Sequence, residues 1–242
     1  GSREHPCEDP LRARFNALSK RDQSAILDKH RDWNVDHEWY EFQYDMFKEA
    51  MMNRGFYVYD IRFSGFCSQG DGASFSGRVH HFSAFWSAHG ITLPLVKEML
   101  DQGHTNTLSL RCVRTAGVYA HSGMMDAENG FHVDDPAFDH PLEQAAWEMK
   151  KVAAEQEWTD FVERSIGILR GHADQLYSEL EAEYEYLTSD EQVLESLIAN
   201  GSLEEQLERY ESDSPEEDYE GQDAAPVQEL LLRAPGAVSE AG

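Results

Sequence analysis

Basic residues are scarce in this sequence. Among 242 residues there are 20 Lys and Arg against 46 Asp and Glu, so the formal net charge is −26. Direct binding to nucleic-acid phosphates requires a surface rich in Lys and Arg, and the composition argues against it. The excess of carboxylates instead favours basic partners, or serves solubility alone.

Cysteine is scarce too, and Cys7, Cys67 and Cys112 form no CxxC pair. Their odd number excludes a disulfide framework and a cysteine-based zinc site, and it favours a reducing compartment. No apolar run approaches the ~18 residues needed to cross a bilayer, and the N-terminus has no apolar signal segment. We therefore expect a cytoplasmic protein that contacts no membrane.

Aromatic residues, by contrast, are plentiful, with 12 Phe, 10 Tyr and 5 Trp. Each buried ring removes ~150–250 Å² from water, so a folded core is expected. The length fits a single domain, which we place at residues 9–211 and assign to the α+β class. Residues 1–8 are interpreted as a tag scar and flexible N-terminus, and residues 212–242 as a disordered tail that is acidic and then rich in Ala, Pro and Gly.

Residues 9–54 are predicted to be helical. Residues 9–31 form a polar helix in this interpretation, and residues 37–53 carry the clearest helical pattern. Its apolar face combines Tyr40, Tyr44, Phe47 and Met51 with Trp39, Phe42 and Met46 alongside. Such a broad face at helical period is typical of packing on a core rather than of a cofactor site.

Residues 56–127 are predicted to form a small antiparallel sheet, because apolar and polar residues alternate there. The expected strands are 56–66, 73–79, 107–115 and 118–127, turned at Gly70-Asp71-Gly72 and at Ala116-Gly117. The residues expected to share one face of the first strand are Tyr57, Tyr59, Ile61 and Phe63. A short helix is predicted at 93–102 and a loop at 128–141.

Residues 141–211 are predicted to be a helical, acidic part. One or two helices cover 141–187, and capping-box spacings predict short helices at 190–200 and 203–211. Residues 174–223 contain 18 acids and one base, Arg209. The residues predicted to contact a basic partner are Glu179, Glu181, Glu183, Glu185, Asp190, Glu191, Glu204 and Glu205.

The stretch FSGFCSQGDGASFSG, residues 63–77, allows two interpretations. Its glycines can simply reverse the chain, with Ser68 and Gln69 capping exposed amides. Alternatively, flexible backbone and polar side chains can cradle a ligand. The candidate ligand-binding residues of this loop are Ser68, Gln69, Gly70, Asp71, Gly72 and Ser74. The loop lacks the P-loop and GxSxG patterns, and no catalytic residue is assigned.

Three arginines fall on the predicted polar faces of strands: Arg62, Arg78 and Arg111. They either pair with acids across the sheet or, with His121, form a groove for a phosphorylated small molecule. The His and Asp residues of 132–140, with His80, His81 and His121, contain metal-ligand types, but their spacing matches no metal motif. No metal ligand and no cofactor are therefore assigned.

Residues 63–75 resemble a motif, SGFxSQGDGAxF, carried by a family of uncharacterised bacteriophage and prophage proteins. The segments 39–42, 119–123 and 184–191 are similar to that family as well, and the similarity covers residues 37–200. The resemblance implies an accessory phage gene product acting in the host cytoplasm, with no activity to transfer.

We therefore expect a non-enzymatic phage-type accessory protein that binds a host protein with a basic surface and inhibits or modulates it. Counter-defence through an acidic surface that mimics nucleic acid fits this charge pattern. Two alternatives remain open. One is a small-molecule or nucleotide-binding protein that uses the SQGDG loop and the sheet arginines, and the other is a metal-dependent hydrolase.

Overall fold

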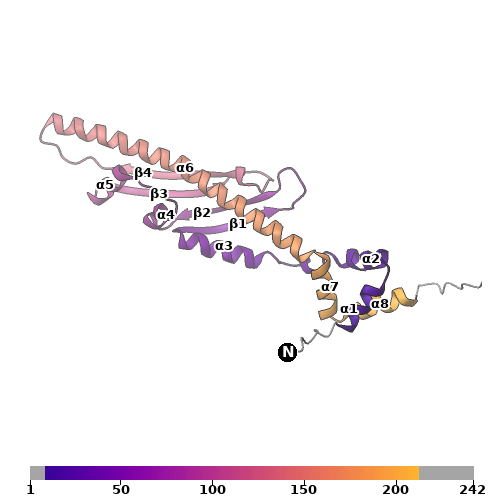
Figure 1. Cartoon of the computed structure of the whole chain (residues 1–242). Helices are drawn as coiled ribbons and strands as arrows, with labels where there is room; N and C mark the ends of the chain where they lie inside the picture. Colours follow the sequence, from indigo (N-terminus) through magenta and orange to yellow (C-terminus); the bar gives the residue numbers. More distant parts are fainter. Residues whose placement is uncertain (1–8, 213–242) are drawn as a thin grey trace, which may run out of the picture.

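The structure, a computed structural model, describes residues 9–212 (Figure 1). The predicted tag scar and all of the predicted tail beyond Ser212 lie outside the described residues. The described chain is elongated, with an α/β body at one end and a unit of short helices at the other. A long helix, α6 (Pro141–Leu187), runs along the body and reaches the helical unit.

The body is built on a four-stranded antiparallel sheet in which each strand pairs with the next along the chain. The strands are β1 (Phe56–Ser64), β2 (Gly72–Val79), β3 (Thr105–Arg114) and β4 (Met125–Val133). With the helices before and after this sheet, the predicted α+β class is confirmed.

Helices cover one face of the sheet and leave the other face open. The covering helices are α3 (Glu41–Asn53), α4 (Phe82–Ala88), α5 (Pro94–Asp101) and α6. The most deeply buried side chains between the two layers include Phe56, Phe75, Phe85, Leu110 and Leu176. On the open face, Tyr57, Arg78, Arg111 and Glu128 form one row across all four strands, and each is exposed.

A bulge in β1 reverses the predicted facing of its tyrosines. The pairing with β2 shifts between Val58 and Asp60, so one extra residue enters the strand. Before the bulge Phe56 and Val58 point into the core, and after it Ile61 does. Tyr57 and Tyr59 are 44% and 48% exposed, so the prediction that they share a face with Ile61 is wrong.

The fourth strand begins later than predicted. Residues 118–124 form a wide connection that ends in a 3-10 turn at Ser122–Met124, and β4 runs from Met125 through the segment predicted as loop. The connection packs on the first hairpin, because the amide of Ala120 donates to the carbonyl of Gly70. The strand predicted at 118–127 is therefore wrong for 118–124 and right for 125–127. The loop predicted at 128–141 is wrong for 128–133.

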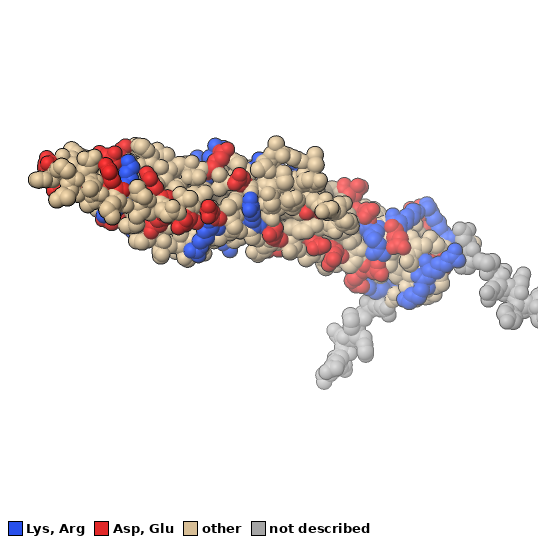
Figure 2. All heavy atoms as spheres, turned by 90° about the horizontal axis from the view of Figure 1, so that it is seen from above, with Lys and Arg blue, Asp and Glu red and all other residues tan. Residues whose placement is uncertain are grey.

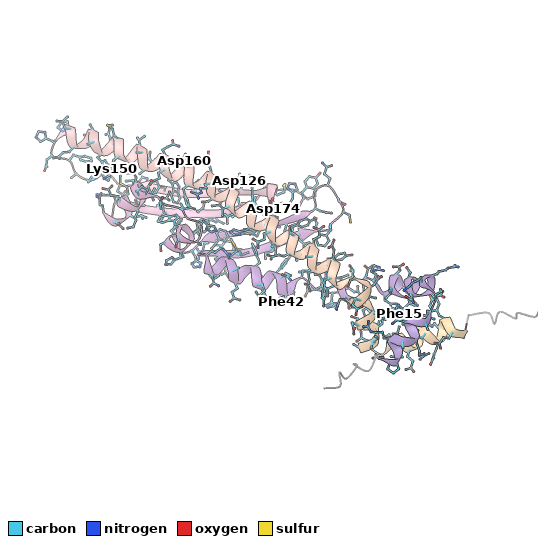
Figure 3. The ribbon with its side chains drawn as sticks, viewed as in Figure 1. Phe15, Phe42, Asp126, Lys150, Asp160 and Asp174 are labelled. Atoms are coloured by element: carbon cyan, nitrogen blue, oxygen red, sulfur yellow. The ribbon has the colours of Figure 1, made fainter. Side chains whose placement is uncertain are left out.

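The apolar stripe of α3 is only partly buried. Phe47 and Met51 lie in the core, as expected for a helix that packs on β1. Phe42 and Met46 are 69% and 51% exposed, and Phe42 projects away from the body (Figure 3). The sheet is too narrow to cover so broad an apolar face, which leaves one side of α3 in solvent.

Residues 141–187 form the single helix α6 of 47 residues rather than two helices. Its middle and last turns bury Trp158, Phe161, Leu169 and Leu180 on the body. Across residues 9–212, no helix combines the length and the apolar character that crossing a bilayer requires.

The predicted polar helix at 9–31 is two helices, α1 (Pro10–Ala17) and α2 (Lys20–His30), because Ser19 caps the start of the second. They pack against α7 (Asp190–Ala199) and α8 (Ser202–Ser212), which match the predicted short helices. This helical unit has its own buried cluster, which includes Phe15, Ile26, Leu197 and Leu207. Residues 9–211, predicted to form one domain, thus contain two main buried clusters joined by α6.

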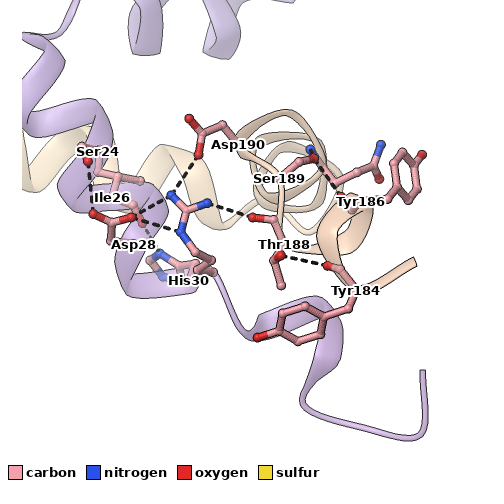
Figure 4. A network of polar contacts seen from close by, with 11 residues as sticks. Ser24, Ile26, Asp28, His30, Tyr184, Tyr186, Thr188, Ser189 and Asp190 are labelled. Carbon is pink, nitrogen blue, oxygen red and sulfur yellow. Dashed lines mark hydrogen bonds and ion pairs between the residues drawn. The ribbon is translucent and has the colours of Figure 1, made fainter. Parts of the chain in front are cut away.

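Hydrogen bonds of Arg31 link the helical unit to the end of α6 (Figure 4). Its guanidinium donates to Asp28, to Asp190 and to the carbonyl of Thr188, at 2.7–2.9 Å. Asn34, in the short 3-10 helix η1 (Trp33–Val35), donates to the carbonyl of Leu187 at 2.9 Å. The joint is therefore largely polar.

Candidate functional site

Four segments far apart in the sequence, 39–42, 63–75, 119–123 and 184–191, meet at one end of the body. The ring of Trp39, which precedes α3, lies 5.8 Å from the ring of Tyr184 on α6. Phe66, in the SQGDG loop, lies 5.2 Å from Tyr184. The Ala120 amide donates to Gly70 on the other side of the same loop. Segments far apart in the sequence thus surround residues 65–72.

Asp71 holds this loop in shape. Its Oδ2 accepts hydrogen bonds from the amides of Cys67 and Ser68, at 2.9 and 2.6 Å, and its Oδ1 accepts one from Ser64 Oγ at 3.2 Å. The bond from Ser68 is the main cause that lowers the pKa of Asp71, with Cys67 and Ser64 adding to it. Asp71 is therefore a carboxylate at neutral pH that caps its own loop.

Two glycines let the loop approach the 118–124 connection closely. Gly70 and Gly72 have φ values of 109° and 153°, which side chains with a Cβ rarely adopt. A Cβ at Gly70 would lie 2.2 Å from a ring carbon of Tyr119, and one at Gly72 would lie 2.5 Å from the Cα of His121. The Gly-Asp-Gly sequence is thus required by packing as well as by the turn.

A shallow pocket of about 460 Å³ opens beside the loop. We call it the loop pocket, and its lining is Trp39, Phe63, Gly65, Phe66, Cys67, Ser68, Asp71 and Tyr184. Three aromatic segments and one carboxylate therefore meet there, and no Lys or Arg is in the lining. Its size falls in the ~300–1,000 Å³ range of ligand pockets.

The predicted loop residues have different positions. Ser68 and Asp71 line the pocket, and the side chain of Gln69 is exposed. Ser74 is fully buried in β2 and is not part of the pocket lining. His121 accepts a hydrogen bond from the Gly123 amide at 3.1 Å and stacks on Tyr119.

The predicted arginines do not join this pocket. Arg62 donates to the carbonyls of Gly117 and Val118, and so braces the 117–118 backbone. Arg78 and Arg111 are neighbours in the β2–β3 register, and Arg111 pairs with Glu128 at 3.3 Å. All three lie on the open face of the sheet, whereas Trp39 and Tyr184 place the loop pocket on the helix-covered side. The structure therefore does not combine the loop and the sheet arginines into one site.

The family of proteins described as a domain of unknown function, DUF8835, matches residues 39–190. This chain belongs to that family. The DUF8835 region begins at Trp39 and ends at the first residue of α7, so it contains the body and the complete loop pocket but none of α1, α2 and α8. No curated protein and no solved structure matches the chain.

The predicted partner-binding acids fall into two groups, which differ in ion pairing and which meet at the end of the DUF8835 region. From its last residue onward, arginines of the helical unit neutralise part of the charge, since Asp190 pairs with Arg31 at 2.9 Å and Glu191 with Arg12 at 3.2 Å. Glu205 pairs with Arg209, and Glu204 has no ion pair within residues 9–212. Figure 2 shows this mixture of basic and acidic side chains at the helical end. Sequence reasoning missed Arg12 and Arg31 because they lie 159 to 183 residues earlier in the chain than the acids that they pair with.

Inside the DUF8835 region the acids at the end of α6 stay unpaired. Glu179 accepts a hydrogen bond from Gln175, and none of Glu179, Glu181, Glu183 and Glu185 has an ion pair within residues 9–212. Burial, and then the nearby charges of Glu181 and Asp71, raise the pKa of Tyr177. Beside Trp39, the hydrogen bond and the charge of Glu38 raise the pKa of Glu41. The surroundings of the loop pocket are therefore negative.

Several of the His and Asp residues considered as metal ligands have other roles. His81 Nδ1 accepts from the Ala84 amide at the start of α4. Asp135 accepts from Lys151 and from the indole of Trp147, at 2.9 and 3.0 Å. Within the described part of the chain, no three His, Cys, Asp or Glu residues are grouped so as to hold a metal ion.

The sequence analysis placed Trp39 on the apolar face of a helix and gave Phe66 and Tyr184 no role. Each belongs to one of the four segments 39–42, 63–75, 119–123 and 184–191. Their rings converge in space in the structure, which is what makes them site candidates.

Proposed function

We propose that this protein is a non-enzymatic accessory protein of phage type, which binds a host protein with a basic surface and inhibits or modulates it in the host cytoplasm. The observation that supports this most is the unpaired charge of Glu179, Glu181, Glu183 and Glu185 in the last turns of α6, the part of the helix that also carries Tyr184 of the loop pocket. The arginines of the helical unit leave these four side chains free of ion pairs among residues 9–212.

The spacing of these acids strengthens the proposal. Glu179 lies one turn before Glu183, and Glu181 one turn before Glu185. Like charges at this spacing destabilise a helix by ~0.2–0.5 kcal/mol per pair. Binding of a basic surface would remove this repulsion, whereas solubility alone does not require the charges to be adjacent.

The phage assignment draws on the SQGDG motif and its three companion segments. A protein with this charge pattern is suited to bind a site that normally holds nucleic acid. Its carboxylates and the phosphates of nucleic acid both present closely spaced negative charges. Blocking such a site of a host defence protein is the form of inhibition that we propose.

The test is capture from host lysate at low salt, followed by binding of the purified partner. A variant with all four residues changed to Gln should lose at least tenfold in affinity, and raising the salt concentration should weaken the wild type more than the variant. The matched control changes Glu143, Glu148, Glu155 and Asp160, at the far end of α6, to their amides and should bind as the wild type does. Equal binding by both quadruple variants would refute the proposal.

A second candidate function has one supporting observation. Arg78 and Arg111 are adjacent on an open sheet face next to the exposed ring of Tyr57, which suits a phosphorylated small molecule or nucleotide. A nucleotide panel in a thermal-shift assay tests it. A specific ligand should raise the melting temperature of the wild type but not of Arg78→Ala, with Lys97→Ala as the control on an unrelated helix.

A further inference from the structure

We infer that the loop pocket binds a single arginine side chain of a partner protein. This inference rests on the proposed function, because it names the group by which a basic partner would be anchored. The arginine site would add a defined contact to the general attraction between the acids of α6 and a basic surface.

The aromatic walls of the pocket favour a flat cation. Trp39, Phe66 and Tyr184 lie with ring centroids 5.2–6.5 Å apart, and they come from three separate segments of the chain. All three rings are half-buried, so each keeps an exposed part. A guanidinium stacks on such rings through both its charge and its plane, and arginine is the cation most often found in these contacts.

The carboxylate of Asp71 supplies the charge. Its three internal hydrogen bonds occupy only part of the acceptor capacity of a carboxylate, which accepts about four. Because no Lys or Arg lines the pocket, the charge of Asp71 is not neutralised within it. Those same hydrogen bonds fix the carboxylate in place, so it needs no reorganisation to receive a donor.

Other occupants fit this pocket less well. An anion would meet Asp71 and the nearby Glu181, which are both negative. A neutral apolar side chain would bury Asp71 without giving it a partner, which is unfavourable. A lysine ammonium carries the charge but lacks the plane that matches the rings, and it holds its hydration shell more strongly.

The experiment uses the full chain and three short capped peptides that differ only in their central residue: arginine, lysine or citrulline. Citrulline has the shape of arginine without its charge. Binding is followed by NMR through the indole resonance of Trp39, which is assigned by its loss in Trp39→Phe. The arginine peptide should shift this resonance saturably, and the other two peptides should bind at least fivefold more weakly. Equal binding of citrulline or lysine would overturn the inference.

Variants of the pocket give the second arm. Asp71→Asn keeps an acceptor for the loop amides and removes the charge, and Phe66→Leu keeps the volume and removes a ring. Each should weaken binding of the arginine peptide at least fivefold. Asp160→Asn is the matched control, since it removes one exposed charge of α6 about 36 Å from Tyr184 along the helix axis. Unchanged affinity in both Asp71→Asn and Phe66→Leu would contradict the inference.

The inference and the proposed function can fail separately. If a host partner binds Phe66→Leu and Asp71→Asn as tightly as the wild type, the arginine site is wrong and the acidic partner surface stands. If the arginine peptide binds in the loop pocket but the quadruple Gln variant leaves partner binding unchanged, the site stands and the proposed function fails.

Discussion

The Nε2 atoms of His89 and His172 lie 3.0 Å apart, between the end of α4 and the middle of α6. His89 Nδ1 lies 2.8 Å from the carbonyl of Phe85 and so donates a hydrogen bond to it. The two facing Nε2 atoms are too close for both of them to carry a proton, so one donates and the other accepts. Burial, followed by the charges of His89 and Arg54, lowers the pKa of His172 to about 4.

This pair predicts a loss of stability in mild acid. Between pH 6.5, the ordinary pKa of His, and about 4, the unfolded chain binds a proton that the folded protein excludes. The contribution is fully present above pH 6.5 and falls as the pH drops toward 4, by ~1–2 kcal/mol after allowance for solvent screening. Urea unfolding at several pH values measures it. In His172→Gln this part of the pH dependence should disappear, and curves parallel to the wild type would contradict the assignment.

The glycines predict opposite effects of one substitution. Gly72→Ala forces a Cβ to within 2.5 Å of the His121 backbone at a positive φ. We therefore expect the free energy of unfolding to fall by ~1–3 kcal/mol. Gly171 lies on the solvent side of α6, and a Cβ added there would meet no atom within 4 Å. Gly171→Ala should therefore raise the free energy of unfolding by ~0.5–1 kcal/mol. Chemical denaturation measures both. Similar changes in the two variants would show that the loop relaxes to accept a side chain.

Local patterns in the sequence predicted much of this fold. The period-two segment at 73–79, the helix start capped by Ser189 and the helices at 94–101 and 202–212 all appear within a few residues of their expected places. These elements are determined by neighbours in the sequence, because capping and side-chain alternation are local.

What failed depends on contacts between distant residues. The bulge at Tyr59 and the late start of β4 follow from pairing with other strands, and no signal in their own residues marks them. The loop pocket needs Trp39, Phe66 and Tyr184 to converge, and the charge of α7 depends on Arg12 and Arg31. Periodicity and composition carry no information about such pairings.

Two cysteines of the body should differ in reactivity. Cys67 is exposed in the loop, whereas Cys112 is buried, and burial raises the pKa of its thiol to about 12. Because the thiolate is the reactive form, iodoacetamide at pH 8 should modify Cys67 within minutes and Cys112 only after unfolding. Peptide mass spectrometry with and without urea resolves the two. Rapid labelling of Cys112 in the folded protein would mean that the β2–β3 pairing opens readily.

The helical unit should lose its structure independently of the body. Its buried cluster shares no residue with the body cluster, and the joint at Arg31 and Asn34 is polar. Leu197→Ala removes a fully buried side chain from that unit and should destabilise it by ~2–5 kcal/mol.

Hydrogen exchange by mass spectrometry tests this independence. In Leu197→Ala, exchange should accelerate in α1, α2, α7 and α8, while the amides of β1 to β4 stay protected. Leu169→Ala, equally buried but in the body, is the matched control and should accelerate exchange in the sheet instead. If Leu197→Ala accelerated exchange in the sheet to the same extent, α6 would be coupling both clusters into one cooperative unit. The partner surface at the end of α6 would then depend on the helical unit for its stability.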